Sequence, residues 1–396
     1  MTVFTPTEAR FGWRPRAASC KRALALSLAL LLAPVAASAI ELQVAGRESI
    51  LFDQRTQACD ANDLPDAPAR AFRNAEGQMV LFAPNFRNRA LVGPDIRHLA
   101  RDCAVRFAAK GASDPNLLDD RTWLHGFYTK DGTNVFAFAS ASFIPYRHKE
   151  RCNAGSERTA CWRNGVAALV SHDGGKTFTD SAPPPAHVLM PPVPYSPDQK
   201  NPAGFISATN IVTYKGDLYS IVWRRDAEAR RSRNCLVRAK DGNVDRWEVW
   251  IGDSFAPLAE RTPQGWKVER TDCAAVGQGL PSIRGLVFHP ASGTFIAVFQ
   301  MQPRGKQQGE SGFYTATSKD MVQWSEPKLL SAQPLRDGLE DAGTFNGYPA
   351  LIDGQSPDRN FGSVGDTADL VFVRLLPDPK TKRTRQLIAL PLRITP

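Results

Sequence analysis

The octapeptide Ser171-His172-Asp173-Gly174-Gly175-Lys176-Thr177-Phe178 combines an acidic turn, two glycines and a closing aromatic residue. An aspartate in such a turn accepts hydrogen bonds from nearby backbone N–H groups, and glycine adopts the positive φ that tight turns need. The closing aromatic residue is expected to pack between neighbouring sheets. Looser copies occur at 318–324 and 239–247. The recurrence predicts a structural turn repeated along the chain, not a set of catalytic aspartates.

Short strand-like runs with alternating apolar and polar residues surround these turns, and long amphipathic helices are almost absent. The runs form five successive pairs, most of them separated by a glycine-containing turn: 69–72 with 78–83, 124–128 with 135–139, 207–214 with 217–223, 283–289 with 294–300, and 348–352 with 370–375. Units recurring at roughly 50–80 residues predict an all-β fold, a five-bladed β-propeller. A pair of β-sandwiches is the alternative, which explains the strands but not their even recurrence.

Residues 1–39 have the pattern of a secretory signal peptide. Five basic residues between positions 10 and 22 precede an apolar stretch at 23–33, and Ala37-Ser38-Ala39 forms a small-residue cleavage site. The apolar stretch is shorter than the about 20 residues that a membrane span needs, which disfavours the alternative of an uncleaved anchor. We therefore expect a secreted protein, periplasmic or extracellular. Residues 40–396 would form a single β-propeller domain with no membrane span.

Six cysteines follow the predicted signal, an even number that suits three disulfides in an oxidising compartment. Isolated histidines and the lack of a C-x-x-C pair argue against zinc. A calcium ion in a propeller tunnel has no support in the sequence, so no cofactor is predicted. Six cysteines allow 15 pairings, and sequence neighbours suggest Cys59–Cys103, Cys152–Cys161 and Cys235–Cys273.

The net charge of the whole chain is +9, but residues 1–39 contain five basic residues and one acidic residue, so the mature chain carries about +5. Basic residues cluster between Arg224 and Arg233. Such a cluster favours an acidic ligand such as a uronic acid, a sialic acid or lipopolysaccharide, or else it is a solvated loop. The modest mature charge and the lack of a recognition motif argue against nucleic acid. We expect a monomer.

Across most of the mature chain, the turn pattern and the repeated strand units resemble the Asp-box and five-bladed propeller glycosidases. These families include the six-bladed sialidases and the five-bladed arabinanase, xylosidase and fructosidase group. The sequences Tyr348-Pro349-Ala350-Leu351-Ile352-Asp353 and Ser356-Pro357-Asp358-Arg359-Asn360-Phe361 are similar to those of secreted bacterial propellers of this kind. The resemblance implies a glycoside hydrolase-like site at one mouth of the central tunnel, with the Asp-box on the opposite rim. A six-bladed, sialidase-like propeller is the alternative fold that it implies.

The resemblance places Asp66 before the first inner strand, where five-bladed furanosidases carry their base; its alternative is a turn-forming residue between Pro65 and Pro68. Glycoside hydrolysis usually needs two carboxyl groups. The second catalytic candidate is Glu340, in the loop that enters the last unit. The candidates for substrate binding at the mouth are Arg70, Asn85, Arg87, His125, Asn210, Arg224, Arg284, Asn346 and Arg374.

A sialidase-like mechanism makes different use of the same mouth. Three arginines would hold a substrate carboxylate, since guanidinium groups bind carboxylates through two parallel hydrogen bonds. Arg70, Arg284 and Arg374 are the candidates, each with a structural salt bridge as its alternative role. Tyr348 would be the nucleophile, with Glu340 beside it as its acidic partner.

The sequence therefore predicts a secreted carbohydrate-active propeller, glycoside hydrolase-like, that acts on or binds an acidic or bacterial-type glycan. A noncatalytic propeller that binds a glycan or a protein at the same mouth is the alternative. A structural scaffold, with the tunnel filled by bulky apolar side chains, is a third possibility. A second carboxyl group about 5–10 Å from Asp66 separates the enzyme from the binding module.

Overall fold

Almost all regular structure in the described part of the chain is β-strand. The computed structural model describes Gly12 and residues 40–153, 159–183, 186–227, 232–302, 309–335 and 343–396. The predicted signal peptide at 1–39 lies outside these residues, apart from Gly12. No helix among the described residues is long and apolar enough to cross a membrane. The helical pieces are short: α1 (Gln54–Gln57), η1 (Pro145–Arg147), η2 (Lys149–Arg151), η3 (Lys240–Gly242) and η4 (Pro290–Ser292).

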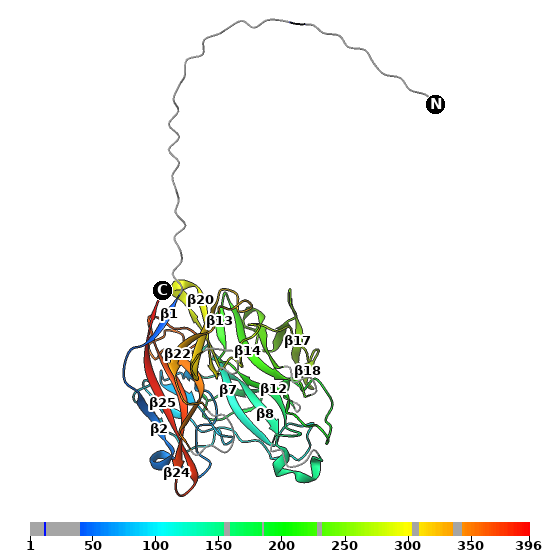
Figure 1. Cartoon of the computed structure of the whole chain (residues 1–396). Coiled ribbons are helices and arrows are strands. Elements are labelled where there is room, and N and C mark those ends of the chain that lie inside the picture. The colour runs from blue at the N-terminus through cyan, green and yellow to red at the C-terminus, as the bar shows by residue number, and fades with distance from the viewer. Residues whose placement is uncertain are drawn as a thin grey trace, which may run out of the picture. The chain divides into compact units, whose positions relative to one another are not determined.

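The described strands form four sheets, and within the largest a short parallel pair (residues 203–204 with residues 163–164) joins two antiparallel units. The antiparallel units are here called blades 1 to 5 in chain order, with blades 2 and 3 sharing that largest sheet (Figure 1). Blade 1 contains β3 (Arg70–Arg73), β4 (Met79–Phe82), β5 (Leu91–Gly93) and β6 (Ala100–Arg101). Blade 2 contains β7 (Arg121–Thr129), β8 (Val135–Phe143), β9 (Arg163–Ser171), β10 (Thr179–Asp180) and β11 (His187–Leu189). Blade 3 contains β12 (Ala203–Ala208), β13 (Val212–Tyr214), β14 (Asp217–Arg225), β15 (Ser232–Ala239), β16 (Arg246–Trp250), β17 (Phe255–Thr262) and β18 (Gly265–Val268).

Blade 5 joins both ends of the described chain. Blade 4 precedes it with β19 (Gly285–His289), β20 (Thr294–Met301), β21 (Gly312–Ser318) and β22 (Lys328–Ala332). Blade 5 contains β23 (Phe345–Ile352), β24 (Thr367–Asp378) and β25 (Lys382–Thr395), and both β1 (Glu41–Val44) and β2 (Ser49–Asp53) pair antiparallel with β25. In Figure 1 the blue N-terminal strands lie against the red C-terminal strand. Residues more than 300 positions apart thus complete one sheet.

The fold is an all-β propeller, as predicted, and the predicted strand pairs correspond to antiparallel pairs in every blade. One predicted strand, 207–214, is interrupted. The Thr209 hydroxyl accepts the Ile221 N–H at 3.0 Å and so replaces a backbone carbonyl in the pairing with β14. As a result β12 ends at Ala208 and β13 begins at Val212. Side-chain hydrogen bonding of this kind competes with regular strand pairing.

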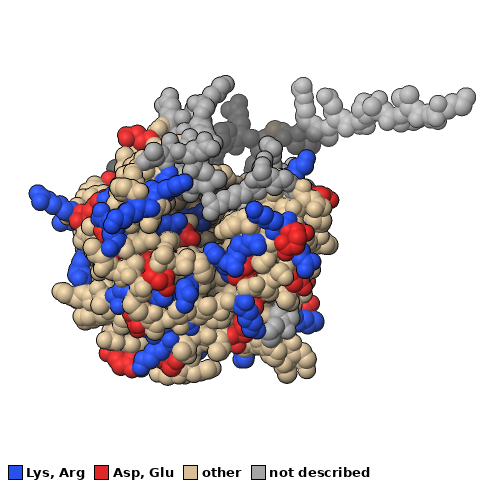
Figure 2. Space-filling model, turned by 90° about the horizontal axis from the view of Figure 1, so that it is seen from below, with Lys and Arg blue, Asp and Glu red and all other residues tan. Residues whose placement is uncertain are grey.

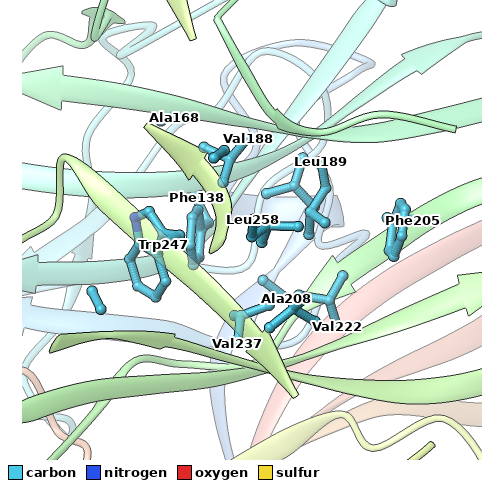
Figure 3. Close-up of a cluster of buried hydrophobic side chains, with 14 of the residues drawn as sticks. Phe138, Ala168, Val188, Leu189, Phe205, Ala208, Val222, Val237, Trp247 and Leu258 are labelled. Atoms are coloured by element: carbon cyan, nitrogen blue, oxygen red, sulfur yellow. The ribbon is translucent and has the colours of Figure 1, made fainter. Parts of the chain in front are cut away.

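The aromatic residues of the repeated turns pack between blades. Trp247 of blade 3 is 1% exposed, and its ring lies 4.5 Å from that of Phe138 in blade 2. Phe178 lies 6.1 Å from Phe82 in blade 1 and 5.9 Å from Phe127 in blade 2. Figure 3 shows the cluster around Trp247, to which strands of blades 2 and 3 both contribute. Removing this apolar surface from water holds neighbouring blades together.

The aspartates of the turns are occupied by local hydrogen bonds. Asp173 Oδ1 accepts the Thr177 N–H at 2.9 Å, and Asp320 Oδ1 accepts the N–H groups of Val322 and Gln323, each at 2.8 Å. Burial raises the pKa of Asp173, but hydrogen bonds, led by that from the Thr177 hydroxyl, outweigh burial and leave the pKa below its ordinary value. These carboxylates stabilise turns. The structure also contains the disulfides Cys59–Cys103, Cys152–Cys161 and Cys235–Cys273.

Candidate functional site

Bulges interrupt the first strands of blades 2, 3 and 5. The register shifts lie between Leu124 and Phe127 in β7, between Ile206 and Ala208 in β12, and between Gly347 and Ala350 in β23. Bulges redirect side chains and are common beside functional sites. Each of these three contains a residue that lines one shared cavity: His125, Ser207 and Tyr348.

The cavity has a volume of about 250 Å³ and mixes aromatic, hydroxyl and charged side chains. Blade 2, with the connection between β8 and β9, contributes half of the lining residues, and the rest come from blades 3, 4 and 5 and from the segment that enters blade 1. Among the described residues that line it, Asp66 is the one carboxyl group. The lining residues are Asp66, Trp123, His125, Ser140, Ser142, Thr159, Trp162, Asn164, Pro202, Ile206, Ser207, Arg225, Arg284 and Tyr348.

Asp66 is held by residues of blade 5. The Tyr348 hydroxyl donates to Asp66 Oδ1 at 3.3 Å, and the Arg385 guanidinium forms a hydrogen-bonded ion pair with the same oxygen. Arg385 also donates to the Pro65 carbonyl at 2.9 Å, which fixes the segment that carries Asp66. The negative charge of Asp66, together with burial, raises the pKa of Tyr348 to about 12. The tyrosine therefore remains a neutral hydrogen-bond donor at neutral pH.

Two arginines line the cavity without an acidic partner. Arg284 donates from Nη1 to the Ser207 hydroxyl at 3.3 Å, and no hydrogen bond or ion pair joins either Arg284 or Arg225 to a carboxylate of the described chain. Burial lowers the pKa of both groups, and the charge of Arg225 lowers the pKa of Arg284 further. Both positive charges line the same cavity, and their mutual repulsion is unfavourable until an anion joins them.

Arg70 is buried next to the site but is not among the residues that line the cavity. It is 2% exposed and donates to the carbonyl oxygens of Ala69 at 2.8 Å and Ala208 at 3.3 Å, and to that of Arg284. Burial, and then the charge of Arg284, lower its pKa to about 9. Arg70 thus connects blades 1, 3 and 4, and its positive charge acts on His125.

His125 is a neutral imidazole in this setting. Burial, followed by the charges of Arg70 and Arg284, lowers its pKa to about 3. Several other polar atoms around the cavity are buried and without a partner among the described residues: Trp123 Nε1, Trp162 Nε1, His125 Nδ1, Asn164 Oδ1 and Arg284 Nε. Unpaired buried polar atoms are costly, so their concentration here indicates a site for a polar ligand. On the face shown in Figure 2, by contrast, basic and acidic side chains are interspersed.

Four of the predicted site residues line the cavity: Asp66, His125, Arg284 and Tyr348. Glu340 lies outside the described residues. The others have partners elsewhere: Arg70 donates to backbone carbonyls, Asn85 to the Asn62 carbonyl, Arg87 lies 3.9 Å from Asp60, Asn210 accepts the Leu286 N–H, Arg224 pairs with Asp226, Asn346 bonds to Gln333 and Arg374, and Arg374 pairs with Glu48.

Sequence reasoning missed Trp123, Trp162, Asn164, Arg225 and Arg385. Arg225 was one position away from the predicted Arg224, and neighbouring residues of a strand face opposite sides. The same alternation, counted back two positions from His125, would have found Trp123. Arg385 lies on β25, a strand absent from the predicted pairs. Among the described residues, no group of three His, Cys, Asp or Glu side chains is arranged to hold a metal ion.

No protein-family model matches this chain, and no curated protein matches its sequence. Solved structures with a similar backbone fold include an endo-arabinase from Bacteroides thetaiotaomicron. It has 13% sequence identity and a TM-score of 0.44, and the match covers 85% of this chain and 96% of that one. Another is the catalytic domain of a Coprinopsis cinerea GH62 alpha-L-arabinofuranosidase, with 9% identity, a TM-score of 0.45, and coverage of 86% and 95%. A family 117 glycoside hydrolase from Zobellia galactanivorans has 10% identity, a TM-score of 0.43, and coverage of 87% and 91%.

Proposed function

We propose that this chain is a secreted carbohydrate-active propeller that binds an acidic sugar in the cavity at its mouth. The observation that carries the proposal is the pair Arg225 and Arg284, which line the cavity without a carboxylate partner among the described residues. Guanidinium groups bind carboxylates strongly when water is displaced, because each forms charge-assisted hydrogen bonds in a fixed planar geometry. A ligand carboxylate would relieve the repulsion between the two arginines.

The remaining lining supports a sugar as the carrier of that acid. Trp123 and Trp162 offer aromatic surface, while Ser140, Ser142 and Asn164 offer hydroxyl and amide groups. Ligand sites typically combine apolar or aromatic walls with a few placed polar groups that fix orientation. A sugar ring has both an apolar C–H face and hydroxyl groups at its rim, which suits this mixture.

Secretion is part of the proposal, and it rests on the signal pattern at 1–39 and on three disulfides, which persist in oxidising compartments. Expression of the full chain in a bacterial host with its own signal tests it. Mass spectrometry of the exported protein should give an N-terminus near Ile40 and no free thiol among the six remaining cysteines. Retention in the cytoplasm with residues 1–39 intact would contradict it.

Binding to acidic saccharides tests the central proposal. Isothermal titration of the exported protein with glucuronic, galacturonic and sialic acid saccharides, and with neutral saccharides of the same size, should show binding of at least one acidic member and at least tenfold weaker binding of its neutral counterpart. Arg225→Gln should weaken binding of that member by about tenfold, the change that 1.4 kcal/mol gives.

Lys130→Gln is a matched control, because it removes one positive charge from an exposed residue just beyond the far end of β7. It should bind the acidic saccharide as the unmodified chain does. Equal binding of acidic and neutral saccharides, or no effect of Arg225→Gln, would exclude the arginine pair as an acid-binding site.

Hydrolysis is a second candidate function, favoured by the hydrogen bond between Tyr348 and Asp66. In this scheme Tyr348 Oη forms a bond to the anomeric carbon while Asp66 takes the hydroxyl proton and the glycosidic C–O bond breaks. The negative charge next to the tyrosine and its raised pKa mean that proton removal must accompany the attack. The leaving oxygen takes its proton from water, because Asp66, the one carboxyl group among the described lining residues, is accepting the tyrosine proton. A second water then attacks the anomeric carbon as its bond to Tyr348 Oη breaks; Asp66 returns its proton to Oη, and the proton of the attacking water goes to solvent.

Chromogenic glycosides of the same acidic sugars test hydrolysis separately from binding. If the scheme holds, Tyr348→Phe should lower kcat by at least a hundredfold while the dissociation constant changes by less than about threefold. Binding without turnover in the unmodified chain would remove the hydrolytic scheme and leave a noncatalytic binding propeller.

A further inference from the structure

A second arginine position lies farther out along the cavity wall, on strand β7. Arg121 stands directly opposite Ser142 in β8, just as Trp123 stands opposite Ser140. Directly opposed residues of an antiparallel pair point to the same face of the sheet, and so do residues two apart on one strand. Trp123, Ser140 and Ser142 all line the cavity. Arg121 therefore extends the same wall, one step beyond Trp123.

The Arg121 guanidinium is fixed in place but not neutralised. Its central carbon lies 3.7 Å from the centre of the Phe86 ring, a stacked cation–π arrangement. Its Nε is buried without a partner, and no hydrogen bond or ion pair joins Arg121 to another described residue. Burial and the charge of Arg147 lower its pKa.

The two acids near Arg121 are already engaged by other cations. Asp120 accepts the Ile144 N–H at 3.2 Å and lies 3.2 Å from Arg147 and 3.3 Å from His148. Asp66 is paired with Arg385. Both charges are therefore shared with closer partners, and Arg121 keeps capacity for an anion from outside the chain.

Other arginines that stack on phenylalanine in this protein differ from Arg121. Arg238 stacks on Phe255 and pairs with Glu248; Arg374 stacks on Phe372 and pairs with Glu48; Arg73 stacks on Phe361 and donates to the Gly354 carbonyl. Each of these three stacked guanidinium groups also has a hydrogen-bonding partner within the protein. A stacked guanidinium beside the cavity with no such partner is preorganised for a ligand, because its orientation is fixed before binding.

We propose that Arg121 forms a second anion subsite and that the ligand is an acidic oligosaccharide with acidic groups on at least two sugars. One acidic group would contact Arg225 and Arg284, and the next sugar would pass Trp123 and place its acidic group at Arg121. The inference rests on the proposed function, since it assigns the first acidic sugar to the same cavity. It names the substrate class as a polyanionic glycan rather than a single terminal acidic sugar.

Chain-length dependence of binding tests this. The exported protein is titrated with the mono-, di- and trisaccharides of galacturonic acid, of glucuronic acid in alternation with a neutral sugar, and of α2,8-linked sialic acid. In the series that binds, the first member with two acidic groups should bind about five- to tenfold more tightly than the member with one, as an added partly exposed ion pair allows. Arg121→Gln should reduce this ratio to less than twofold, whereas Lys130→Gln should leave it unchanged.

The outcomes distinguish this subsite from the cavity itself. Equal affinity for one and two acidic groups, or an unaltered ratio in Arg121→Gln, overturns the second subsite while Arg225→Gln still reports on the first. Arg121→Lys separates stacking from charge, because it retains the positive charge without the planar group. If this variant binds saccharides with one and two acidic groups equally, the second subsite requires the planar, stacked guanidinium. Failure of every acidic saccharide to bind overturns both proposals. Thermal unfolding of each variant within about 2 °C of the unmodified chain shows that folding is intact.

Discussion

Side chains in and beside the cavity shift one another's pKa values. Arg70, Arg284 and Arg225 bring positive charge into a buried region that contains one lining carboxylate, and Arg385 already pairs with that carboxylate. His125 remains neutral because burial, and then the charges of Arg70 and Arg284, lower its pKa. A fold gains nothing from unpaired buried cations, since each loses its hydration. Their presence together is therefore better explained by a ligand than by stability.

The depressed pKa of His125 makes stability depend on pH. The unfolded chain binds a proton near pH 6.5, whereas the folded chain does so only near pH 3, so stability is complete above pH 6.5 and falls as the pH falls toward 3. Between pH 7 and pH 4.5 the loss from this one group is about 2–3 kcal/mol, at 1.36 kcal/mol per unit. His125→Gln should remove that part of the loss.

Urea unfolding at pH 7 and pH 4.5 measures the loss of stability that comes from His125. His172→Gln is the control, because His172 is exposed. The quantity to compare is the difference in unfolding free energy between the two pH values, so any constant effect of a substitution cancels. The same pH-dependent loss in His125→Gln as in the unmodified chain would show that His125 does not resist protonation in the folded state.

At the level of strands, bulges place three of the lining residues, whereas Asp66 and Arg284 come from segments between strands. Ser207 and Tyr348 have φ of 55° and 57°, a left-handed conformation that costs energy for residues other than glycine. Each lies at the bulge of an inner strand and lines the cavity. Neighbouring bonds hold the strain in place: the Tyr348 N–H donates to Gln300 Oε1 at 3.2 Å, and the Ser207 hydroxyl accepts from Arg284.

Two substitutions at Ser207 test whether the bulge is strained. Ser207→Gly should leave the melting temperature unchanged or raise it slightly, because glycine adopts positive φ freely. Ser207→Val should lower the stability by about 2 kcal/mol, because a β-branched residue is a pronounced outlier in this region. Thermal unfolding monitored by circular dichroism compares them. A valine variant as stable as the glycine variant would mean that the inner strand is not constrained at this position.

The strands could be predicted from the sequence more fully than the lining of the cavity could. Period-two alternation and glycine turns are local signals, and they located the paired strands of every blade. The alternation along β14 is regular, but it does not reveal which of its two faces meets the cavity, so the position Arg224 was chosen in place of Arg225. The Asp66 ion pair with Arg385 joins residues 319 positions apart. Such a contact depends on how β25 completes the last sheet, which local patterns do not reveal.

Over the whole molecule, covalent and sheet closures restrain the chain at different lengths. The pairing of β1 and β2 with β25 joins the two ends of the described chain. The disulfide Cys59–Cys103 spans 44 positions, whereas Cys152–Cys161 spans 9. A longer closed loop removes more conformational entropy from the unfolded chain. The long-range disulfide is therefore the greater contributor to stability.

Replacing both cysteines of each disulfide with serine tests which disulfide contributes more to stability. The double variant of Cys59 and Cys103 should lose about 4 kcal/mol, and that of Cys152 and Cys161 about 2.7 kcal/mol, on the loop-entropy relation. Urea unfolding of both variants under non-reducing conditions gives the two values. Equal losses, or a greater loss from the short bridge, would show that local packing rather than chain entropy determines the contribution.

The most direct test of the acidic-sugar site is a crystal structure of the exported protein with the tightest-binding acidic saccharide. The account predicts one sugar carboxylate within hydrogen-bond distance of both the Arg225 and the Arg284 guanidinium groups, with the ring against Trp123 or Trp162. A saccharide bound on the outer surface of a blade, or one that enters the cavity with its carboxylate directed away from both arginines, would contradict the assignment of this mouth as an acid-recognition site.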